Sequence, residues 1–483
     1  MQVKFPPRHS VLLALVVFAI SGCTAYEPAP LELRDHAQTF RDRSLESARS
    51  AELVKPALEA ALTLLKRSDL EELPHTDGQL GLEDAERLTL VLNRDVRVAR
   101  ARAAGRSATV NFAGLLDDPT LDVDVLRVIE DVEEPWILGS GIGFTIPLSG
   151  RHGLERKLAA AESGVAWYEA VKAEFDALLE LRRRWLAWSV AVQRVELIND
   201  YLKALEPLQV TAKHLAEAGE IGPVEGQVLA IEAASRRAEL VRAEAQTAEL
   251  RAAVLDQIGL SPVATIDLTP YTSVELSPSH YVSLMNMADI AEPTFILDHP
   301  AALTAKARHA SAERQLELEV RRQVPDLVVG PRYESEDDQN RIGLGLSLVP
   351  IPVFNRNRQG IARAEAERDL ARVEAETTVE ALLSQYDQAR TRLNGSMARW
   401  ALLVEDVLPL VEAQQESIRR LAALGEVDVL LLIDVFQASL HLHLDVLDAN
   451  ETTLGALNLV GSYLLAPNVV SSTATTRPTR RKP

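Results

Sequence analysis

The chain has 483 residues, of which 47% are apolar and 25% charged, a balance typical of a folded protein rather than a disordered one. Its formal net charge at pH 7 is −19. Because phosphate contacts dominate the affinity of proteins for nucleic acids, and a polyanion would be repelled by most of this surface, the charge excludes nucleic acid as a partner.

The N-terminus has the pattern of a secretory signal peptide over residues 1–22. Lys4 and Arg8 form a short basic region, and residues 11–20 are all apolar, a run too short to span a bilayer. Small residues follow and end at Cys23, the only cysteine in the chain. This arrangement resembles the lipobox of bacterial lipoproteins, in which the cysteine becomes the first mature residue and carries acyl chains. We therefore expect Cys23 to be the site of lipid attachment.

The two halves of the chain carry the same landmarks, separated by about 205 residues. Each half begins with a helical stretch rich in alanine and arginine, and each contains a proline, then an arginine, then a glycine in a similar sequence context. In the first half these landmarks are Asp95, Pro147, Arg151 and Gly219, and in the second half they are Pro300, Pro352, Arg356 and Gly425. The chain is therefore predicted to contain two copies of one unit.

Each unit contains two segments that we expect to form a β-hairpin. Residues 341–349 place isoleucine and leucine on one face of a strand and mainly glycine and serine on the other, because side chains alternate with period two. Residues 136–146 follow a similar pattern. Their expected partners are residues 326–334 and 120–129, and both connecting turns are acidic. Strands of about ten residues with one apolar face and one small or polar face are typical of transmembrane β-barrels.

Long helical segments follow each strand pair. Between residues 151 and 205 apolar residues recur at heptad spacing, and a second helix is expected over residues 208–258. The second unit is predicted to repeat this pattern over residues 361–407 and 410–465. A soluble antiparallel coiled coil would explain these helices, and a sandwich strand with one wet face would share the period of two. Neither accounts for the strands, the glycines and the export signal together.

Four such strands cannot close a barrel by themselves. Unpaired backbone groups in hydrocarbon cost several kcal/mol each, and closure needs about eight strands. The chain has no uninterrupted apolar run of about 18 residues or more that would form a spanning helix. We therefore expect the protein to oligomerise and to reach the membrane through a barrel and a lipid.

The sequence resembles the TolC family of outer-membrane efflux ducts over residues 80–465. The match is carried by LGLEDAERLTLVLNRDV, by the corners IPLSGR and IPVFNR, and by the helix-end sequences HLAEAGEIGPVE and RLAALGEVDVLLLID. The family implies a homotrimer in which four strands per subunit close a twelve-stranded β-barrel and twelve long helices form a periplasmic tunnel. The stretch DDPTLDVDVLRVIED is similar to the first strand of the subgroup that serves heavy-metal cation pumps.

The expected fold is therefore mainly α with a small β part: two tandem repeats of long antiparallel helices form an α-helical barrel, and four transmembrane strands contribute to the trimeric β-barrel. The resemblance and the composition divide the chain into a signal peptide (1–22), an N-terminal lipid-anchored linker and equatorial segment (23–80), the first repeat (81–261), an inter-repeat equatorial segment (262–297), the second repeat (298–466) and a disordered basic tail (467–483).

The resemblance also implies a function and its site. The protein would be the outer-membrane channel of a tripartite efflux system, passively conducting substrates from an inner-membrane pump and a periplasmic adaptor. Gly219 and Gly425 would lie at the periplasmic tip, where the adaptor docks. Glu225 and Asp434 match acidic gate positions, although a solvated helix face explains them equally well. Leu431 stands where a gate aspartate is usual, which favours closure of the tip by apolar contact.

The sequence contains no Ser-His-acid arrangement, Gly-rich phosphate loop or metal-spaced cluster. We therefore expect no enzyme activity, no bound metal and no cofactor other than the N-terminal lipid. The alternative function is that of a periplasmic coiled-coil lipoprotein, which acts as a structural or secretion scaffold and forms no pore. The glycine-rich strands distinguish the two hypotheses, because a scaffold has no need of them.

Overall fold

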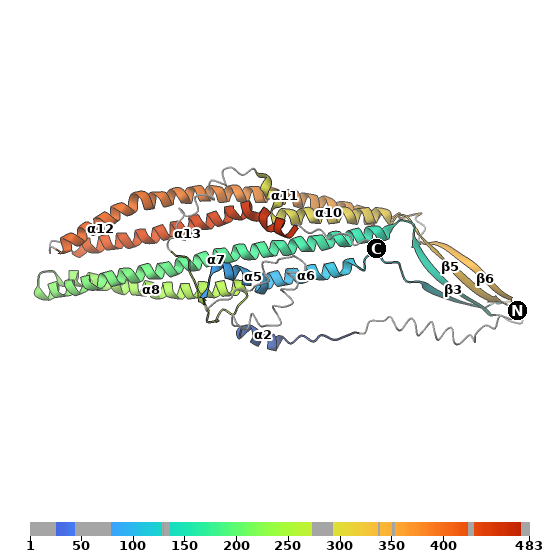
Figure 1. The fold of residues 1–483 in the computed structure, drawn as a ribbon, viewed down its shortest axis with the longest axis horizontal. Coiled ribbons are helices and arrows are strands. Elements are labelled where there is room, and N and C mark those ends of the chain that lie inside the picture. The colour runs from blue at the N-terminus through green and yellow to red at the C-terminus, as the bar shows by residue number, and fades with distance from the viewer. Residues whose placement is uncertain are drawn as a thin grey trace. The chain divides into compact units, whose positions relative to one another are not determined.

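The structure, a computed structural model, describes residues 26–43, 79–127, 129, 136–272, 293–336, 339–349, 353–423 and 429–474. The predicted signal peptide, Cys23 and Gly425 therefore lie outside the described residues. Contacts divide the chain into two compact units, Met1–Asp42 and Arg43–Pro483. In the described part of the first unit the regular element is the helix α2 (Leu33–Arg41). The other labelled elements of Figure 1 belong to the second unit.

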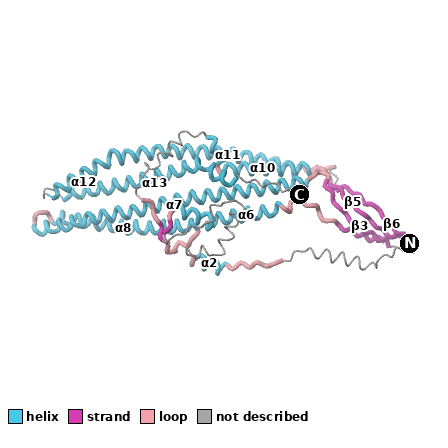
Figure 2. Tube along the Cα trace, viewed as in Figure 1, coloured by secondary structure: helices cyan, strands magenta, loops and turns pink. Residues whose placement is uncertain are grey.

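The second unit contains the same order of elements twice: a helix, two strands and two long helical segments (Figure 2). The two halves in which this order occurs are those that carry the sequence landmarks. After β1 (Gln79–Leu80), the first repeat contains α5 (Leu82–Leu92), α6 (Arg94–Val110), β2 (Thr120–Arg127), β3 (Trp136–Pro147), α7 (Arg151–Ala218) and α8 (Pro223–Ile258). After β4 (Asp267–Leu268) and η3 (Pro293–Asp298), the second repeat contains α10 (Pro300–Arg321), β5 (Asp326–Glu336), β6 (Gln339–Val349), α11 (Arg358–Ala401), η4 (Leu402–Val407), α12 (Leu408–Ala423) and α13 (Val429–Ala474).

Comparable caps start the helix that precedes the strands in each repeat. Asn93 caps α6, and its side-chain oxygen accepts hydrogen bonds from the backbone N–H groups of Asp95 (2.9 Å) and Val96 (3.2 Å). His299 caps α10, and its Nδ1 accepts from the N–H of Ala301 at 3.2 Å. Each cap satisfies donors that the first turn of a helix leaves without an intrahelical partner. These caps explain why both helices begin next to the predicted landmarks.

The four long strands form one antiparallel sheet in the order β2-β3-β5-β6. β2 with β3 and β5 with β6 are the predicted hairpins. β3 also pairs with β5, so the hairpins of the two repeats lie side by side. The register places Val329 opposite both Phe144 and Leu346. Since directly opposed residues project to the same side of a sheet, most of the apolar residues of the four strands share one face.

The long helix of the first repeat, α7, is continuous over 68 residues, which is about 100 Å at the usual helical rise. The predicted division into helices over 151–205 and 208–258 was wrong, because Pro207 lies inside α7 instead of ending it. Proline removes one backbone hydrogen bond and usually kinks or ends a helix. Here Leu205 and Ala212 are buried in one apolar core on either side of the proline, so tertiary packing holds the helix together.

The second repeat departs from the sequence prediction in the same way. The expected helices over 361–407 and 410–465 are replaced by α11, η4 and α12, which follow one another without a gap. The π-helical segment η4 comes directly before the turn that contains Pro409, and local changes of this kind let a helix accommodate an irregularity. The last helix, α13, continues to Ala474, beyond the predicted end of the repeat at residue 466.

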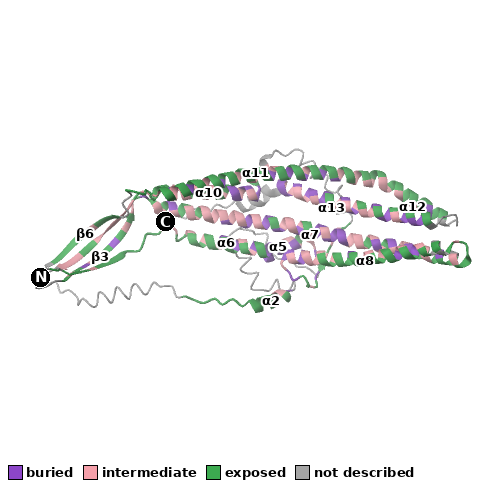
Figure 3. Cartoon of the chain, turned by 180° about the vertical axis from the view of Figure 1, so that it is seen from behind, coloured by how far each residue is buried: buried purple, intermediate pink, exposed green. Residues whose placement is uncertain are grey.

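α7 packs against α5, α6, α8, α10 and α13, while α11 packs against α10 and α13. Buried residues follow the facing sides of these helices (Figure 3). They form three main apolar clusters along the bundle. The first is centred on Trp185 and Ile258, the second on Tyr386 and Leu457, and the third on Leu205 and Phe436.

One described helical segment, Leu430–Leu464 of α13, is long and apolar enough to cross a membrane by length and composition alone. Its most apolar 18-residue window is 44% buried inside the bundle. A helix in the core of a helical bundle has the same properties. The packing of α13 against α7 and α11 therefore accounts for its apolar character.

Candidate channel wall and helical tip

One face of the sheet is apolar and exposed. Ile342 is 84% exposed and Leu121 is 71% exposed, although both are large apolar residues. Soluble proteins rarely leave so extended an apolar surface uncovered, so this face indicates a lipid or protein contact. We call it the apolar face, and its large exposed residues are Leu121, Val123, Val125, Trp136, Leu138, Ile142, Phe144, Ile146, Ile342, Leu344, Leu346 and Leu348.

The opposite side of the sheet, which we call the glycine face, carries small and charged residues in rows across the strands. Toward the helices, one row carries nothing larger than threonine: Thr120, Gly143, Gly330 and Gly345. Toward the hairpin turns, each of the next two rows carries charged residues. The first of these is Asp122, Gly141, Arg332 and Gly343, and the second is Asp124, Gly139, Glu334 and Arg341.

An ion pair crosses β3 on the glycine face. Arg332 of β5 donates from Nη2 to Oδ2 of Asp124 on β2 at 2.6 Å, although β2 and β5 are not neighbouring strands. The glycines of β3 leave room for this contact. A Cβ at Gly139 would lie 3.3 Å from the Cβ of Asp124, and one at Gly141 would lie 3.5 Å from Cγ of Arg332. Small residues in β3 therefore let side chains from the two flanking strands meet above it.

Gly330 allows a close approach between β5 and β3. A Cβ at this position would lie 1.6 Å from the carbonyl oxygen of Ile142, a distance that the backbone cannot accommodate without moving. The pairing of β3 with β5 is interrupted at this point and resumes at Phe144 opposite Val329. Pro331 follows and has no N–H to donate. The glycine is therefore needed for the join between the two hairpins.

Charged and polar side chains fix the corners where strands meet helices. Arg151, in the corner IPLSGR, contacts Asp117 at 2.5 Å and Asp326 at 3.4 Å, and so ties the start of α7 to the segments that lead into β2 and β5. In the corner of the second repeat, Asn357 adopts a left-handed backbone (φ 51°). Its amide donates to the backbone oxygen of Glu319 at 2.9 Å and to its carboxylate at 2.6 Å. Arg151 therefore holds the sheet against α7, while Asn357 joins the start of α11 to α10.

α7 and α8 form a helical hairpin, and the turn between them lies at the end of the bundle far from the sheet (Figure 1). Gly219 has a φ of 76° and its N–H donates to the carbonyl of Ala216 at 3.1 Å, a left-handed termination that glycine adopts without strain. Pro223 then starts α8, a position that suits its fixed φ. The structure thus places Gly219 at a hairpin end. The equivalent Gly425 lies outside the described residues, between α12 and α13.

The three gate candidates are on the helices that lead away from the tip. Glu225 lies in the first turn of α8. Leu431 and Asp434 lie in the first two turns of α13, and both are exposed, on the side away from the buried residues Leu432 and Ile433. No contact of Leu431 or Asp434 within the described part of this chain assigns either residue a gating role. Their role stays a prediction.

Sequence reasoning missed a polar network that joins α8 to α7 and α13 above the tip. The hydroxyl of Tyr201 donates to Glu232 at 3.0 Å, and Arg236 donates from Nε to the same carboxylate at 2.7 Å. Arg236 also lies 3.4 Å from Nε2 of His441, while Glu232 hydrogen-bonds Gln437. Glu232 and Gln437, like Arg236 and His441, occupy equivalent positions of the two repeats, about 205 residues apart. A search for polar residues at equivalent positions of the two repeats could have identified this network.

Burial and charge shift the pKa values of this network in opposite directions. Burial is the main reason that the pKa of Tyr201 is raised, and the nearby Glu232 adds to it, so the phenol stays protonated. Burial alone would raise the pKa of Glu232, but the hydrogen bond and the charge of Arg236 outweigh it and lower the pKa. The network therefore holds a carboxylate, a guanidinium and a neutral phenol at neutral pH.

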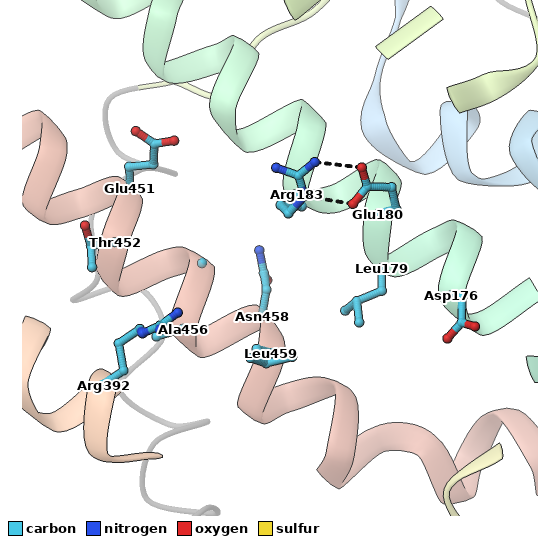
Figure 4. A pocket seen from close by; sticks show the side chains of 11 residues that line it. Asp176, Leu179, Glu180, Arg183, Arg392, Glu451, Thr452, Ala456, Asn458 and Leu459 are labelled. Carbon is cyan, nitrogen blue, oxygen red and sulfur yellow. Dashed lines mark hydrogen bonds and ion pairs between the residues drawn. The ribbon is translucent and has the colours of Figure 1, made fainter. Parts of the chain in front are cut away.

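A hollow of about 500 Å³ lies between α7, α11 and α13 (Figure 4). Asp176, Glu180 and Arg183 line it from α7, and Arg392 and Glu451 line it from the other two helices. The Glu180 carboxylate accepts hydrogen bonds from Arg183 at 2.7 Å, and chiefly for this reason its pKa is lowered to about 2. The Arg183 guanidinium and this carboxylate therefore neutralise each other in the lining of the hollow.

No group of three or more His, Cys, Asp or Glu residues that could hold a metal occurs within the described residues. The two histidines of α13 have separate polar neighbours. Nε2 of His441 faces Arg236, and Nδ1 of His443 lies 2.7 Å from the backbone oxygen of Ser439. Their positions two residues apart on a helix keep them from sharing a ligand.

No family model and no curated protein matches the sequence. Several solved structures are nevertheless similar. OprN, described as an outer-membrane channel, shares 16% identity and a TM-score of 0.65 over 91% of this chain and 98% of its own. CusC, whose crystal structures concern folding and transmembrane channel formation, shares 13% sequence identity with this chain at a TM-score of 0.65. The match covers 79% of this chain and 91% of CusC. The outer membrane protein VceC from Vibrio cholerae shares 15% sequence identity at a TM-score of 0.62, over 79% of this chain and 95% of VceC.

The chain has the fold of an outer-membrane channel protein. The likeness covers nearly the whole length of each solved chain, and at these identities it is a likeness of fold. It confirms the mainly helical fold with few strands that was expected from the resemblance to the TolC family. The sheet lies at one end of the long helices, and the turn between α7 and α8, which contains Gly219, lies at the other end (Figure 1).

Proposed function

We propose that this protein is the outer-membrane channel of a tripartite efflux system. It conducts substrates passively from an inner-membrane pump and a periplasmic adaptor across the periplasm and the outer membrane. The observation that carries the proposal is the sheet with its exposed apolar face and its opposite face of glycines and charges. A strand with lipid on one side and water on the other needs this alternation.

The channel closes as a homotrimer in this proposal. β2 and β6 are the outer strands of the described sheet, each paired along one side only. Open edges are too costly in hydrocarbon, and four strands are too few to close, so further copies must supply the remaining strands. Exposed apolar residues on helices of both repeats support contact between copies, including Ile231 and Val241 on α8 and Leu410 on α12.

The N-terminal lipid and the partner proteins complete the proposal. Acyl chains on Cys23 anchor the mature chain in the outer membrane, and two attachments, lipid and barrel, hold more firmly than one. The adaptor docks on the helix turns at Gly219 and Gly425, while the pump supplies the energy. Similarity of the first strand to the heavy-metal subgroup makes metal cations the first cargo class to test.

Single-channel recording in planar bilayers tests the proposal. The purified, acylated oligomer is added to the bilayer, and steady unitary currents are the expected result. Protein unfolded by heat before the addition serves as the control. A well-folded trimer that stays electrically silent over a range of voltages would overturn the proposal and favour the alternative, a coiled-coil scaffold lipoprotein without a pore.

A further inference from the structure

We infer that the net charge of the two charged rows of the glycine face, in which Asp124 and Arg332 pair above the glycines of β3, sets the ion selectivity of the channel. The inference rests on the proposed function, because it requires the glycine face to line a water-filled bore. This ion pair joins side chains of two strands, β2 and β5, that are not neighbours in the sheet. It holds two opposite charges where passing ions would meet them.

Five charges of the glycine face lie in two neighbouring rows. The two rows nearer the hairpin turns hold three carboxylates and two guanidinium groups, which gives a net charge of −1 per chain: Asp122, Asp124, Glu334, Arg332 and Arg341. The neighbouring row toward the helices is uncharged, with Thr120 beside three glycines. Ions in the bore would therefore meet a ring of mixed charge with a small negative excess.

The position of Arg332 decides how this excess is distributed. Arg332 shares a row with Asp122, but its guanidinium reaches the carboxylate of Asp124 in the next row. Asp122 has no ion-pair partner among the described residues and remains a free negative charge on the wall. Charged rings in a bore with low-dielectric walls select ions by sign, so the bore should prefer cations weakly.

The pair is too exposed to matter much for folding. The side chain of Arg332 is 58% exposed and that of Asp124 is 46% exposed. Ion pairs in such positions contribute little to stability, because water screens them. Removing one partner should consequently change the field in the bore while leaving the sheet intact. Selectivity and folding can therefore be measured separately.

Reversal potentials under a KCl gradient test the inference. Arg332→Gln doubles the negative excess, and we expect it to raise the K⁺ to Cl⁻ permeability ratio by about twofold or more. Asp124→Asn removes the excess and should lower the ratio. The double variant Asp124→Asn/Arg332→Gln restores the net charge, so its ratio should return close to that of the wild type even though the pair is gone.

Arg127→Gln is the matched control. Arg127 belongs to the same sheet but lies on the apolar face, with its guanidinium carbon 5.6 Å from the centre of the Trp136 ring. This variant also loses one positive charge, and it should keep the wild-type reversal potential. Gly343→Asp provides a second route, because it adds a carboxylate to the row of Arg332 where a Cβ meets nothing within 4 Å. It should shift the ratio toward cations with the pair in place.

The outcomes separate the inference from the proposed function. A silent wild-type trimer would overturn the proposed function. Currents from the wild type, together with one permeability ratio shared by all the folded variants, would overturn only the inference. Circular dichroism and size-exclusion chromatography identify any variant that has lost its fold. If the Arg332 and Asp124 variants fail to assemble, the permeability ratio of Gly343→Asp alone tests the inference, and a ratio equal to that of the wild type would overturn it.

Discussion

A single added methyl group at residue 330 is expected to disrupt the sheet. The new Cβ of Gly330→Ala would lie 1.6 Å from the carbonyl oxygen of Ile142, so β3 and β5 would have to separate. Gly343→Ala is the control, since its Cβ enters open space on the next strand. We expect Gly330→Ala to lower the yield of membrane-inserted trimer severalfold, measured by size-exclusion chromatography of detergent extracts. Equal yields from the two variants would contradict this.

His299 couples the cap of α10 to pH. Its Nδ1 can accept the hydrogen bond from Ala301 only when it is unprotonated. The imidazole is buried against the rings of Phe175 and Tyr463, at centroid distances of 4.9 and 5.5 Å. Mainly because of this burial, the pKa of His299 is lowered from 6.5 to about 4, although the charge of Asp176 acts in the opposite direction.

The lowered pKa predicts a loss of stability in acid. Between pH 6.5 and about 4 the unfolded chain binds a proton at His299 that the folded chain does not. The free energy of unfolding therefore carries the full contribution of this group above pH 6.5, and loses up to about 3 kcal/mol of it as the pH falls toward 4. His299→Asn copies the cap Asn93 and should flatten this part of the pH profile. Identical slopes for wild type and variant in thermal unfolding would contradict the assignment.

At the scale of helices, the network around Arg236 is expected to link the two repeats. Arg236→Gln leaves the Glu232 carboxylate, which is 11% exposed, without its cation. Stranding a largely buried charge destabilises by a few kcal/mol, so we expect a loss of about 2 kcal/mol in thermal unfolding followed by circular dichroism. Glu232→Gln/Arg236→Gln should recover most of this loss. A double variant as unstable as the sum of its single variants would rule out coupling between the two residues.

The strands were predictable from sequence because the period of two and the row of glycines are local signals. Residues 136–146 and 341–349 fall in strands whose hairpin partners are the expected ones. The β3–β5 join was not predictable, since it depends on how two hairpins distant in sequence pack. The helix ends at Pro207 and Pro409 were predicted wrongly, because burial of residues such as Leu205 outweighs the local effect of proline.

The candidate site was only partly within reach of the sequence. The position of Gly219 in a turn follows from its local sequence, and its φ of 76° agrees. The Asp124–Arg332 pair joins strands of different repeats, and no local pattern marks it. The same holds for Tyr201, Glu232 and Arg236, whose side chains come together only after α7 and α8 have packed. Contacts between distant elements are thus the part that sequence reasoning missed.

For the molecule as a whole, introduced cysteines can test trimer closure, because Cys23 is the only native cysteine and should be acylated. Val123→Cys on β2 is combined with a cysteine at each of four positions on β6. We expect one combination to give a covalent trimer on oxidation, detected by gel electrophoresis in SDS. The partner positions on β6 are Ile342, Leu344, Leu346 and Leu348.

The control for this experiment is a pair of cysteines within one subunit. Val329→Cys and Leu346→Cys face each other on β5 and β6, so oxidation should leave the protein at the mass of a monomer. If every β2–β6 combination stops at a dimer, the ring is not closed by three copies. A cross-linked species larger than a trimer would contradict closure equally.

The exposed apolar face has a consequence for biogenesis. Under the proposed function, each newly exported subunit must cross the aqueous periplasm before assembly, while it carries an exposed apolar surface and two unpaired strand edges. Such a chain needs an escort that shields the sheet until insertion. We therefore expect cells depleted of periplasmic chaperones to degrade this protein first at the strands, while fragments containing only the helical bundle survive.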